Sequence, residues 1–474
     1  MKLRKLFALI VVLSLVLTAC GQAATQPPTT EAPAAEEPAA TEVVVQTEEP
    51  VVEEPATEEP TAQEVEEPVT LTFWSHWAEE ENKKDVLMAA VDKFQAEHPN
   101  VKVDITWWQK TEMFPAMRNA FTAGEGFPDI FYFDRLGLEF IDAGWLADLT
   151  DAIDWSEVTD FAKQGWTRPG PNGEDGVWAV ALETSTDEIY YNKDIFDELG
   201  IQVPDNYQFT ADEFYDICVK IREAGYDPFA NAVGDAPIMG HYLYSFILTS
   251  KLGEEGLQQL WKGEKSWKDP DVVEAMQYAK KLIDIPVYPA TFSTMKLAES
   301  HVYFHTERKA AMFLVGSWYT GRAFVPPDKG GQPEDFRLGI LRYPSFPDGK
   351  GNDQKVFLVA GSIAVAEMSP HKDLALELLQ DIASTDIGNM WMEQTAGLTG
   401  LKTTEVGGPY QSYFEEYNKT HEGQKYANAF YGLMMPPELT DVFTNVLLQG
   451  LPLGQVTLDD ALDMMEEARL SISE

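Results

Sequence analysis

The chain of 474 residues is poor in cysteine and in positive charge. It has two cysteines, Cys20 and Cys218, and 35 Lys and Arg against 78 Asp and Glu, which gives a formal net charge of −43. With so few cysteines we expect no intramolecular disulfide. The net charge excludes nucleic acid as a partner, because the phosphates would be repelled.

The sequence also lacks the motifs of several enzyme classes. It contains no G-x-S-x-G nucleophile elbow, no P-loop and no H-E-x-x-H motif. His301 and His305 have the i, i+4 spacing of metal ligands, but no Glu follows His301. The turn-rich loop 348–353 lacks the carboxylate spacing of a calcium site. We therefore expect no catalytic residues, no metal ion and no cofactor.

The first twenty residues have the pattern of a processing signal. A basic start precedes the apolar run 6–17, whose twelve residues are too few to span a bilayer comfortably. The run ends in Leu-Thr-Ala-Cys, which resembles the lipobox of bacterial lipoproteins. This resemblance implies cleavage before Cys20 and acylation of its thiol, and two or more acyl chains hold a protein stably on a membrane. The alternative is an ordinary secretory signal with an incidental cysteine.

Residues 21–68 consist mainly of Ala, Thr, Glu, Pro and Val. They include thirteen Glu, no Lys or Arg and no aromatic residue. Such a composition cannot bury a core and predicts a disordered tether between the signal and the body. In polyproline conformation the tether could reach on the order of 140 Å.

From residue 69 onward, strand and helix patterns alternate. Strands are predicted at 71–74, 101–107 and 129–133, with helices at 79–98 and 112–123. This order implies an α/β fold with a parallel sheet and helices on both faces.

A second unit begins near residue 177. Its predicted strands are 189–191, 310–315, 336–341 and 356–365, and the chain reads mostly helical from 369 onward. The unbroken apolar run AAMFLV at 310–315 is typical of a strand buried on both faces. Trp318 follows it, at the end of the strand where open α/β sheets bind ligands. Trp318 either offers its ring to a ligand or caps the core.

Several short motifs occur in a set order along the chain. They are Pro128-Asp129-Ile130 with Asp134-Arg135, Tyr191-Asn192-Lys193-Asp194, Lys309-Ala310-Ala311-Met312 with Gly316-Ser317-Trp318, GSIAVA at 361–366, a helix at 370–383, and Phe443. Together they resemble the extracellular solute-binding proteins of sugar-type ATP-driven (ABC) importers, the class that includes maltodextrin-binding protein. Arg308 departs from the family, which usually carries a Gly before the Lys.

The resemblance implies the two-lobed periplasmic-binding-protein fold, with a central ligand cleft between two α/β lobes. We place lobe one at 69–185 plus 361–403 and lobe two at 186–360 plus 404–474. The chain crosses between them near Glu183 and Leu358, and we expect these crossings to act as hinges.

The strand ends and the resemblance together select eleven residues for the cleft. They are Trp74, His76, Trp77, Glu79, Asp134, Arg135, Glu183, His241, Tyr242, Trp318 and Phe443. Aromatic rings can cover the C–H faces of a sugar, and charged groups hydrogen-bond its hydroxyls at roughly 1.5–3 kcal/mol each. The alternatives are core packing for the aromatic residues, a helix cap for Asp134 and a hinge ion pair for Glu183.

The resemblance implies a monomeric, lipid-anchored receptor on the extracytoplasmic face of the cell membrane. It would capture a carbohydrate and deliver it to an ABC permease driven by separate ATPase subunits. A second hypothesis is a surface-anchored glycoside hydrolase that uses Asp134 and Glu183, because two carboxylates are the usual catalytic pair of such enzymes. A receptor for a polyol phosphate would demand more basic residues than Arg135 alone.

Overall fold

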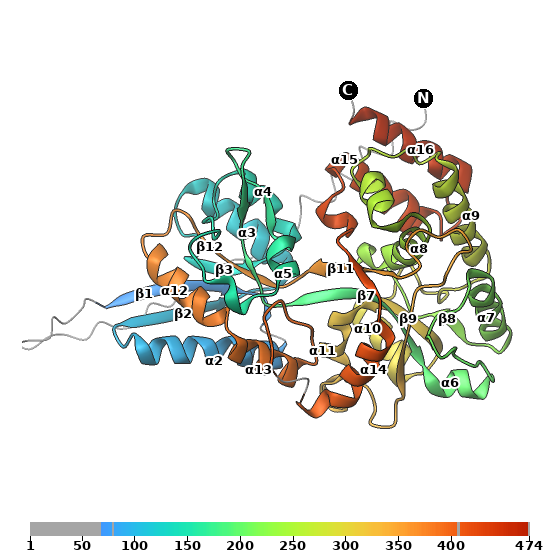
Figure 1. Cartoon of the computed structure of the whole chain (residues 1–474), viewed down its shortest axis with the longest axis horizontal. Helices are drawn as coiled ribbons and strands as arrows, with labels where there is room; N and C mark the ends of the chain where they lie inside the picture. Colours follow the sequence, from blue (N-terminus) through green and yellow to red (C-terminus); the bar gives the residue numbers. More distant parts are fainter. Residues whose placement is uncertain (1–67, 78–79, 405–407, 473–474) are drawn as a thin grey trace, which may run out of the picture. The chain divides into compact units, whose positions relative to one another are not determined.

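The computed structural model describes residues 68–77, 80–404 and 408–472 (Figure 1). The predicted signal peptide with Cys20, nearly all of the predicted tether, and Glu79 lie outside the described residues. Within the described ranges, no helix is both long enough and apolar enough to cross a membrane.

The first sheet has five strands in the order β2-β1-β3-β12-β6. Their bounds are β1 (Val69–Ser75), β2 (Val101–Trp107), β3 (Ile130–Phe133), β6 (Val180–Ala181) and β12 (Ser362–Val365). β1 runs parallel to β2 and β3, as the sequence predicts, whereas β12 is antiparallel to β3 and β6. The first sheet thus takes one strand from much later in the chain.

Helices cover both faces of the first sheet, with α2 and α13 below β1 and β2 and α3 above them (Figure 1). The longest, α2 (Glu81–Glu97), buries Val86, Leu87, Val91 and Phe94 at helical spacing, which explains why it lies on the sheet. The other elements of this part are α3 (Lys110–Ala123), α4 (Leu138–Asp142), α5 (Asp160–Gly165), α12 (Lys372–Ile382), α13 (Thr385–Thr395) and the hairpin of β4 (Thr167–Pro169) and β5 (Asp175–Val177).

The second sheet has the order β13-β11-β7-β9-β8, with β10 paired to β7. Its strands are β7 (Thr184–Asn192), β8 (Asp227–Phe229), β9 (Ala310–Gly316), β10 (Leu338–Leu341), β11 (Gln354–Val359) and β13 (Lys425–Ala427). Every residue of β9 is buried, as its apolar run predicts. β9 is parallel to β8 and antiparallel to β7.

Helices pack around the second sheet, and the apolar core of this part of the chain lies between the helices and the sheet. They are α6 (Lys193–Glu198), α7 (Ala211–Glu223), α8 (His241–Trp261), α9 (Pro270–Asp284), α10 (Leu297–His301), α11 (Thr320–Ala323), α14 (Gln411–His421), α15 (Pro437–Val442), the π-helical segment Phe443–Gly450, and α16 (Leu458–Ser471). α7 begins with a capping box between Thr210 and Glu213 and buries Cys218 as a free thiol.

The chain passes between the two sheets twice, from β6 to β7 and from β11 to β12, and the two crossings lie side by side because β7 pairs with β11 within the second sheet. The predicted single strand 356–365 is wrong here, because the chain changes sheet at Ala360 and Gly361. Glu183 N donates to Gly361 O and Ala360 N donates to Glu183 O, at 2.8 and 2.9 Å. A Cβ on Gly361 would lie 2.7 Å from the Trp77 ring, so the crossing requires glycine. We retain the lobe boundaries 69–185 plus 361–403 and 186–360 plus 404–474 as a proposal.

Arg308, which stands where the family usually has a glycine, precedes β9 with a φ of 52°. This is the left-handed region that glycine adopts most easily. The guanidinium of Arg308 forms an ion pair with Asp335 at 2.6 Å, which offers a contact that glycine lacks.

A fully buried ion network ties β7, β11 and α14 together. The carboxylate of Glu188 pairs with Lys355 and lies 3.0 Å from Nε2 of His421, while the hydroxyl of Thr186 donates to it. Burial raises the pKa of Glu188, but Lys355 and His421 lower it further, to about 2. The carboxylate is therefore ionised at neutral pH and depends on its partners.

Replacing Lys355 with Met keeps the bulk of the side chain and leaves the Glu188 carboxylate buried without its main cation. We expect the free energy of unfolding to fall by about 3–5 kcal/mol, measured by urea denaturation. Lys425→Met is the matched control, because its ion pair with Asp353 is mostly exposed and its loss should leave unfolding unchanged. Equal effects of the two substitutions would contradict the role of the buried network.

Candidate ligand-binding site

A cavity of about 800 Å³ is lined by residues from both sheet regions. From the first come His76 after β1, Gln109 and Lys110 at the start of α3, Gln394, and four residues at the start of α2, namely Glu80, Glu81, Asn82 and Asp85. From the second come residues around α10 and α11 and Tyr410. Its size and its mixture of polar and aromatic groups are typical of a small-molecule site.

Trp318 lies at the edge of this cavity, two residues after β9. Its ring is partly exposed, and its Nε1 donates to the hydroxyl of Tyr242 at 3.3 Å. The guanidinium of Arg322 lies 5.8 Å from the Trp318 ring centre, and the His301 ring lies 6.0 Å away. Arg322 and His301 both line the cavity, so the indole is placed beside it.

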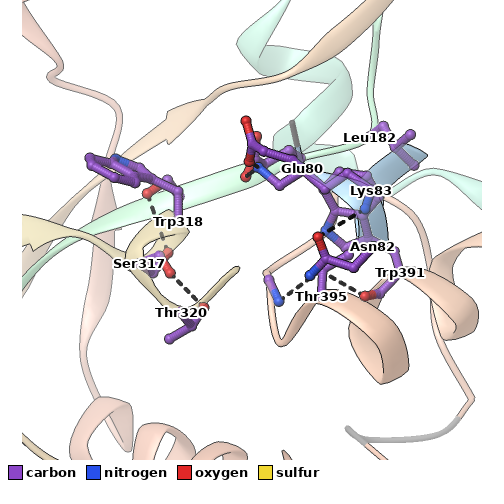
Figure 2. Close-up of polar contacts among 12 residues, drawn as sticks. Glu80, Asn82, Lys83, Leu182, Ser317, Trp318, Thr320, Trp391 and Thr395 are labelled. Carbon is purple, nitrogen blue, oxygen red and sulfur yellow. Dashed lines mark hydrogen bonds and ion pairs between the residues drawn. The ribbon is translucent and has the colours of Figure 1, made fainter. Parts of the chain in front are cut away.

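Glu80 offers a carboxylate to the cavity from the start of α2, where Figure 2 shows it next to Lys83. The ammonium of Lys83 is buried and lies 2.8 Å from Glu80 and 2.7 Å from Glu183. Burial raises the pKa of Glu80, but Lys83 and Arg322 lower it further, to about 2. Glu80 is therefore ionised at neutral pH and can accept hydrogen bonds from a ligand.

Asp134 acts on the cavity through Lys110. Its carboxylate lies 2.5 Å from the Lys110 ammonium, accepts from the Tyr132 hydroxyl at 3.0 Å, and caps the turn after β3 by accepting from Leu136 N at 2.8 Å. Burial raises the pKa of Asp134, but Lys110 and the Leu136 hydrogen bond lower it more. Asp134 is thus a buried anion that holds a cavity-lining cation.

Two neutral imidazoles line the cavity, one from each sheet region. His76 packs edge-on against the Tyr132 ring at 4.2 Å, and burial together with Lys110 lowers its pKa to about 3. Burial also lowers the pKa of His301 well below its usual value. The Nε2 atoms of both rings are buried without a hydrogen-bond partner among the described residues, so each has an unused hydrogen-bonding group next to the cavity.

Six further predicted site residues do not line this cavity. Trp77 and Phe443 are fully buried in the two apolar cores, and Glu183 is engaged by Lys83. His241 and Tyr242 are buried at the start of α8, where the His241 ring lies 3.4 Å from Asp187. Trp74 packs on Trp108.

Arg135 lies close to a segment of the second part of the chain. A Cβ placed on Gly432 would lie 3.1 Å from Cδ of the Arg135 side chain. Of the ten predicted site residues that the structure describes, it therefore places His76 in the cavity wall, and Trp318 and Asp134 next to residues of that wall.

The charged residues Glu80, Lys110 and Arg322 were missed by the sequence analysis. Arg322 follows Trp318 by four residues, the spacing at which a helical cation meets an aromatic ring, and this was the available signal. Among the described residues, no group of three His, Cys, Asp or Glu side chains could hold a metal ion.

A family model for bacterial extracellular solute-binding proteins matches residues 78–387. Since this is more than half of the chain, the protein belongs to that family. It is 23% identical over 319 residues to the multiple sugar-binding protein of Streptococcus mutans, covering 66% of this chain and 70% of that one. It is 24% identical over 324 residues to an uncharacterized ABC transporter extracellular-binding protein of Pyrococcus horikoshii, covering 67% and 70%.

Solved structures share the fold. A chitin oligosaccharide binding protein superposes with a TM-score of 0.72 at 20% identity, covering 85% of this chain and 98% of the other. The two-lobed fold predicted from the sequence is thereby confirmed.

We predict that His76 makes the protein less stable in acid. The unfolded chain takes up a proton on His76 near pH 6.5, whereas the folded chain does so only near pH 3. The free energy of unfolding therefore falls as the pH drops through this interval. His76→Gln should give a shallower decline, measured by urea unfolding at pH 7, 5.5 and 4. Parallel curves for the two proteins would show that His76 does not contribute.

Proposed function

We propose that the protein is a lipid-anchored receptor on the extracytoplasmic face of the cell membrane. It binds a carbohydrate and delivers it to an ABC permease that works with ATPase subunits. The observation that carries this proposal is the 800 Å³ cavity, which is lined by an ionised acceptor, Glu80, and by a donor, Arg322, whose guanidinium lies 5.8 Å from the ring centre of Trp318. The names of two similar proteins, which refer to sugars and to chitin oligosaccharides, support it.

The cavity offers what a neutral sugar needs. Hydroxyl groups donate to Glu80 and accept from Arg322 and Lys110, and hydrogen bonds to such charged groups are the stronger ones. The imidazoles of His76 and His301 add uncharged partners, one from each sheet region. The apolar face of the sugar ring lies on Trp318.

Contacts already join the two sheet regions at and near the cavity, and they fit a closing movement on the ligand. Lys329 forms an ion pair with Glu81 at its rim, and the Thr320 hydroxyl donates to Ala396 O at 2.6 Å. The first partner of each pair belongs to the second sheet region and the other to the first. Closure about the two chain crossings, at Glu183 and at Ala360–Gly361, would bring further groups onto the sugar, and the permease would recognise the closed form.

The structure does not favour a glycoside hydrolase. The carboxylates of Asp134 and Glu183 are each held by a lysine, Lys110 and Lys83. A general acid needs a raised pKa, whereas the pKa of Asp134 is lowered.

A phosphate ester is disfavoured for a different reason. Lys110 and Lys329 already pair with Asp134 and Glu81, and Glu80 adds a further negative charge to the cavity. A dianionic phosphate would meet this charge with only Arg322 left, among the described residues of the cavity, as a cation outside an ion pair.

The test is thermal melting of the full-length protein with malto-, xylo-, cello- and chito-oligosaccharides of one to six units, and with sugar phosphates. A sugar at a hundredfold excess over its Kd adds about 2.7 kcal/mol to the stability of the folded state and raises the melting temperature. We expect one sugar series to do so without being cleaved. A response to phosphates alone, or release of reducing sugar, would reject the proposal.

Trp318→Ala should weaken the binding of that sugar by about five- to a hundredfold, measured by isothermal titration calorimetry. The reason is the loss of roughly 1–3 kcal/mol of apolar contact. Phe161→Ala removes an exposed aromatic ring that does not line the cavity and serves as the control. Unchanged affinity with a lowered melting temperature would show that Trp318 serves only the core.

Cys20→Ser should release the protein from the membrane into the soluble fraction, because acylation of the Cys20 thiol is the proposed anchor. Cell fractionation followed by immunoblotting measures the change. Cys218→Ser is the control, since that thiol is buried in α7 and outside the anchor. Continued membrane attachment of the Cys20 variant would exclude the lipid anchor.

A further inference from the structure

A second hollow of about 450 Å³ meets the ligand cavity at two aromatic residues. Phe324 and Tyr410 line both spaces, and their rings stack with centres 5.2 Å apart and planes 22° apart. Both side chains are partly exposed. The pair therefore offers aromatic surface to both spaces.

The second hollow contains a polar atom that lacks a partner. The Oε1 atom of Gln332 is buried and accepts no hydrogen bond from any described residue, and Gln332 lines this hollow. A buried carbonyl oxygen of this kind is nearly always satisfied in folded proteins. A ligand hydroxyl in the hollow would supply the missing donor.

The charged groups of the second hollow are paired with one another or with close neighbours. Lys193 pairs with Glu416 at 2.5 Å, and Arg337 pairs with Asp194 and Asp197 at 3.0 and 2.7 Å. These five groups carry a net charge of −1, which does not favour an anion, and both cations are already paired. Paired charges with free donor and acceptor capacity suit a neutral, hydroxyl-rich molecule.

A third, more open hollow of about 960 Å³ continues from the second. The two share Lys193, Ser412 and Glu416, and the third adds the side chains of Tyr191 and Tyr207. Aromatic and paired polar groups thus follow one another from the cavity beside Trp318 along α14.

We propose that the second hollow is a further sugar subsite, and that the ligand is a linear oligosaccharide extending past Phe324 and Tyr410 to Gln332. This inference rests on the proposed function and adds the length of the ligand. One end of the chain lies in the 800 Å³ cavity beside Trp318. Later units lie on the aromatic pair and reach the 450 Å³ hollow, where a hydroxyl donates to Gln332.

The test is calorimetry on the full-length protein with the series that raises the melting temperature, from one to six sugar units. The affinity of the unaltered protein should rise with chain length. Tyr410→Ala should weaken binding of the six-unit sugar about tenfold, through lost aromatic contact, and of the one-unit sugar less than twofold. Gln332→Leu keeps the bulk and removes the carbonyl, so it should act in the same length-dependent way.

Tyr426→Ala is the control, because Tyr426 is an exposed tyrosine on β13 that lines none of the three hollows. It should leave every affinity unchanged. Affinity that does not depend on chain length, or equal losses for short and long sugars in both variants, would overturn the second subsite while leaving the receptor function intact. Failure of every sugar series to bind would overturn both.

Discussion

The buried ammonium group of Lys83 is the interaction on which both the crossing and the cavity depend. It lies within 2.8 Å of Glu80, within 2.7 Å of Glu183 and 5.7 Å from the Trp391 ring centre. Burial lowers the pKa of Lys83, but the two carboxylates raise it more, so the group stays charged. Taking this cation out of water is costly, and the two carboxylates offset that cost only if both keep their positions. The charge of Lys83 therefore holds two groups in place. One is Glu80, the hydrogen-bond acceptor for the ligand, and the other is Glu183, at the crossing between the two sheets.

The cavity is close to electrically balanced although the chain as a whole is strongly acidic. Glu80 pairs with Lys83, Lys110 with Asp134, and Lys329 with Glu81. Arg322, over the ring of Trp318, forms no ion pair with the described residues and is the cation left for a ligand. The net charge of −43 thus resides elsewhere, where it favours solubility rather than selecting the ligand.

The sequence predicted the elements that rest on local patterns. The apolar run at 310–315 became β9, and the helical spacing of Val86 to Phe94 became α2. Trp77 and Trp318 show the limit of such patterns, because each follows a strand by two residues. Trp77 is fully buried against Trp391, while Trp318 is partly exposed beside the cavity. Contacts with residues far away in the sequence made that difference.

The roles of Lys83 and Gly361 could not be predicted from the sequence, for the same reason. With Glu80 three residues before it, Lys83 has the spacing of an ordinary exposed ion pair in the first turn of a helix. Its burial follows from Glu183, a hundred residues later, and from Trp391 on α13. Gly361 interrupts an apolar stretch that reads as one strand, and only the change of sheet reveals why it is there.

The position of β12 in the first sheet has a consequence for the order in which the protein folds. β1 to β3 end at Phe133, but β12 begins at Ser362, and the strands β7 to β11 of the second sheet are made in between. Until β12 has been synthesised, β3 carries an unpaired edge, which is open to pairing with other chains. Contacts over such a long separation also form slowly. A chain of this topology therefore completes its first sheet only after the strands β7 to β11 of the second sheet have been synthesised.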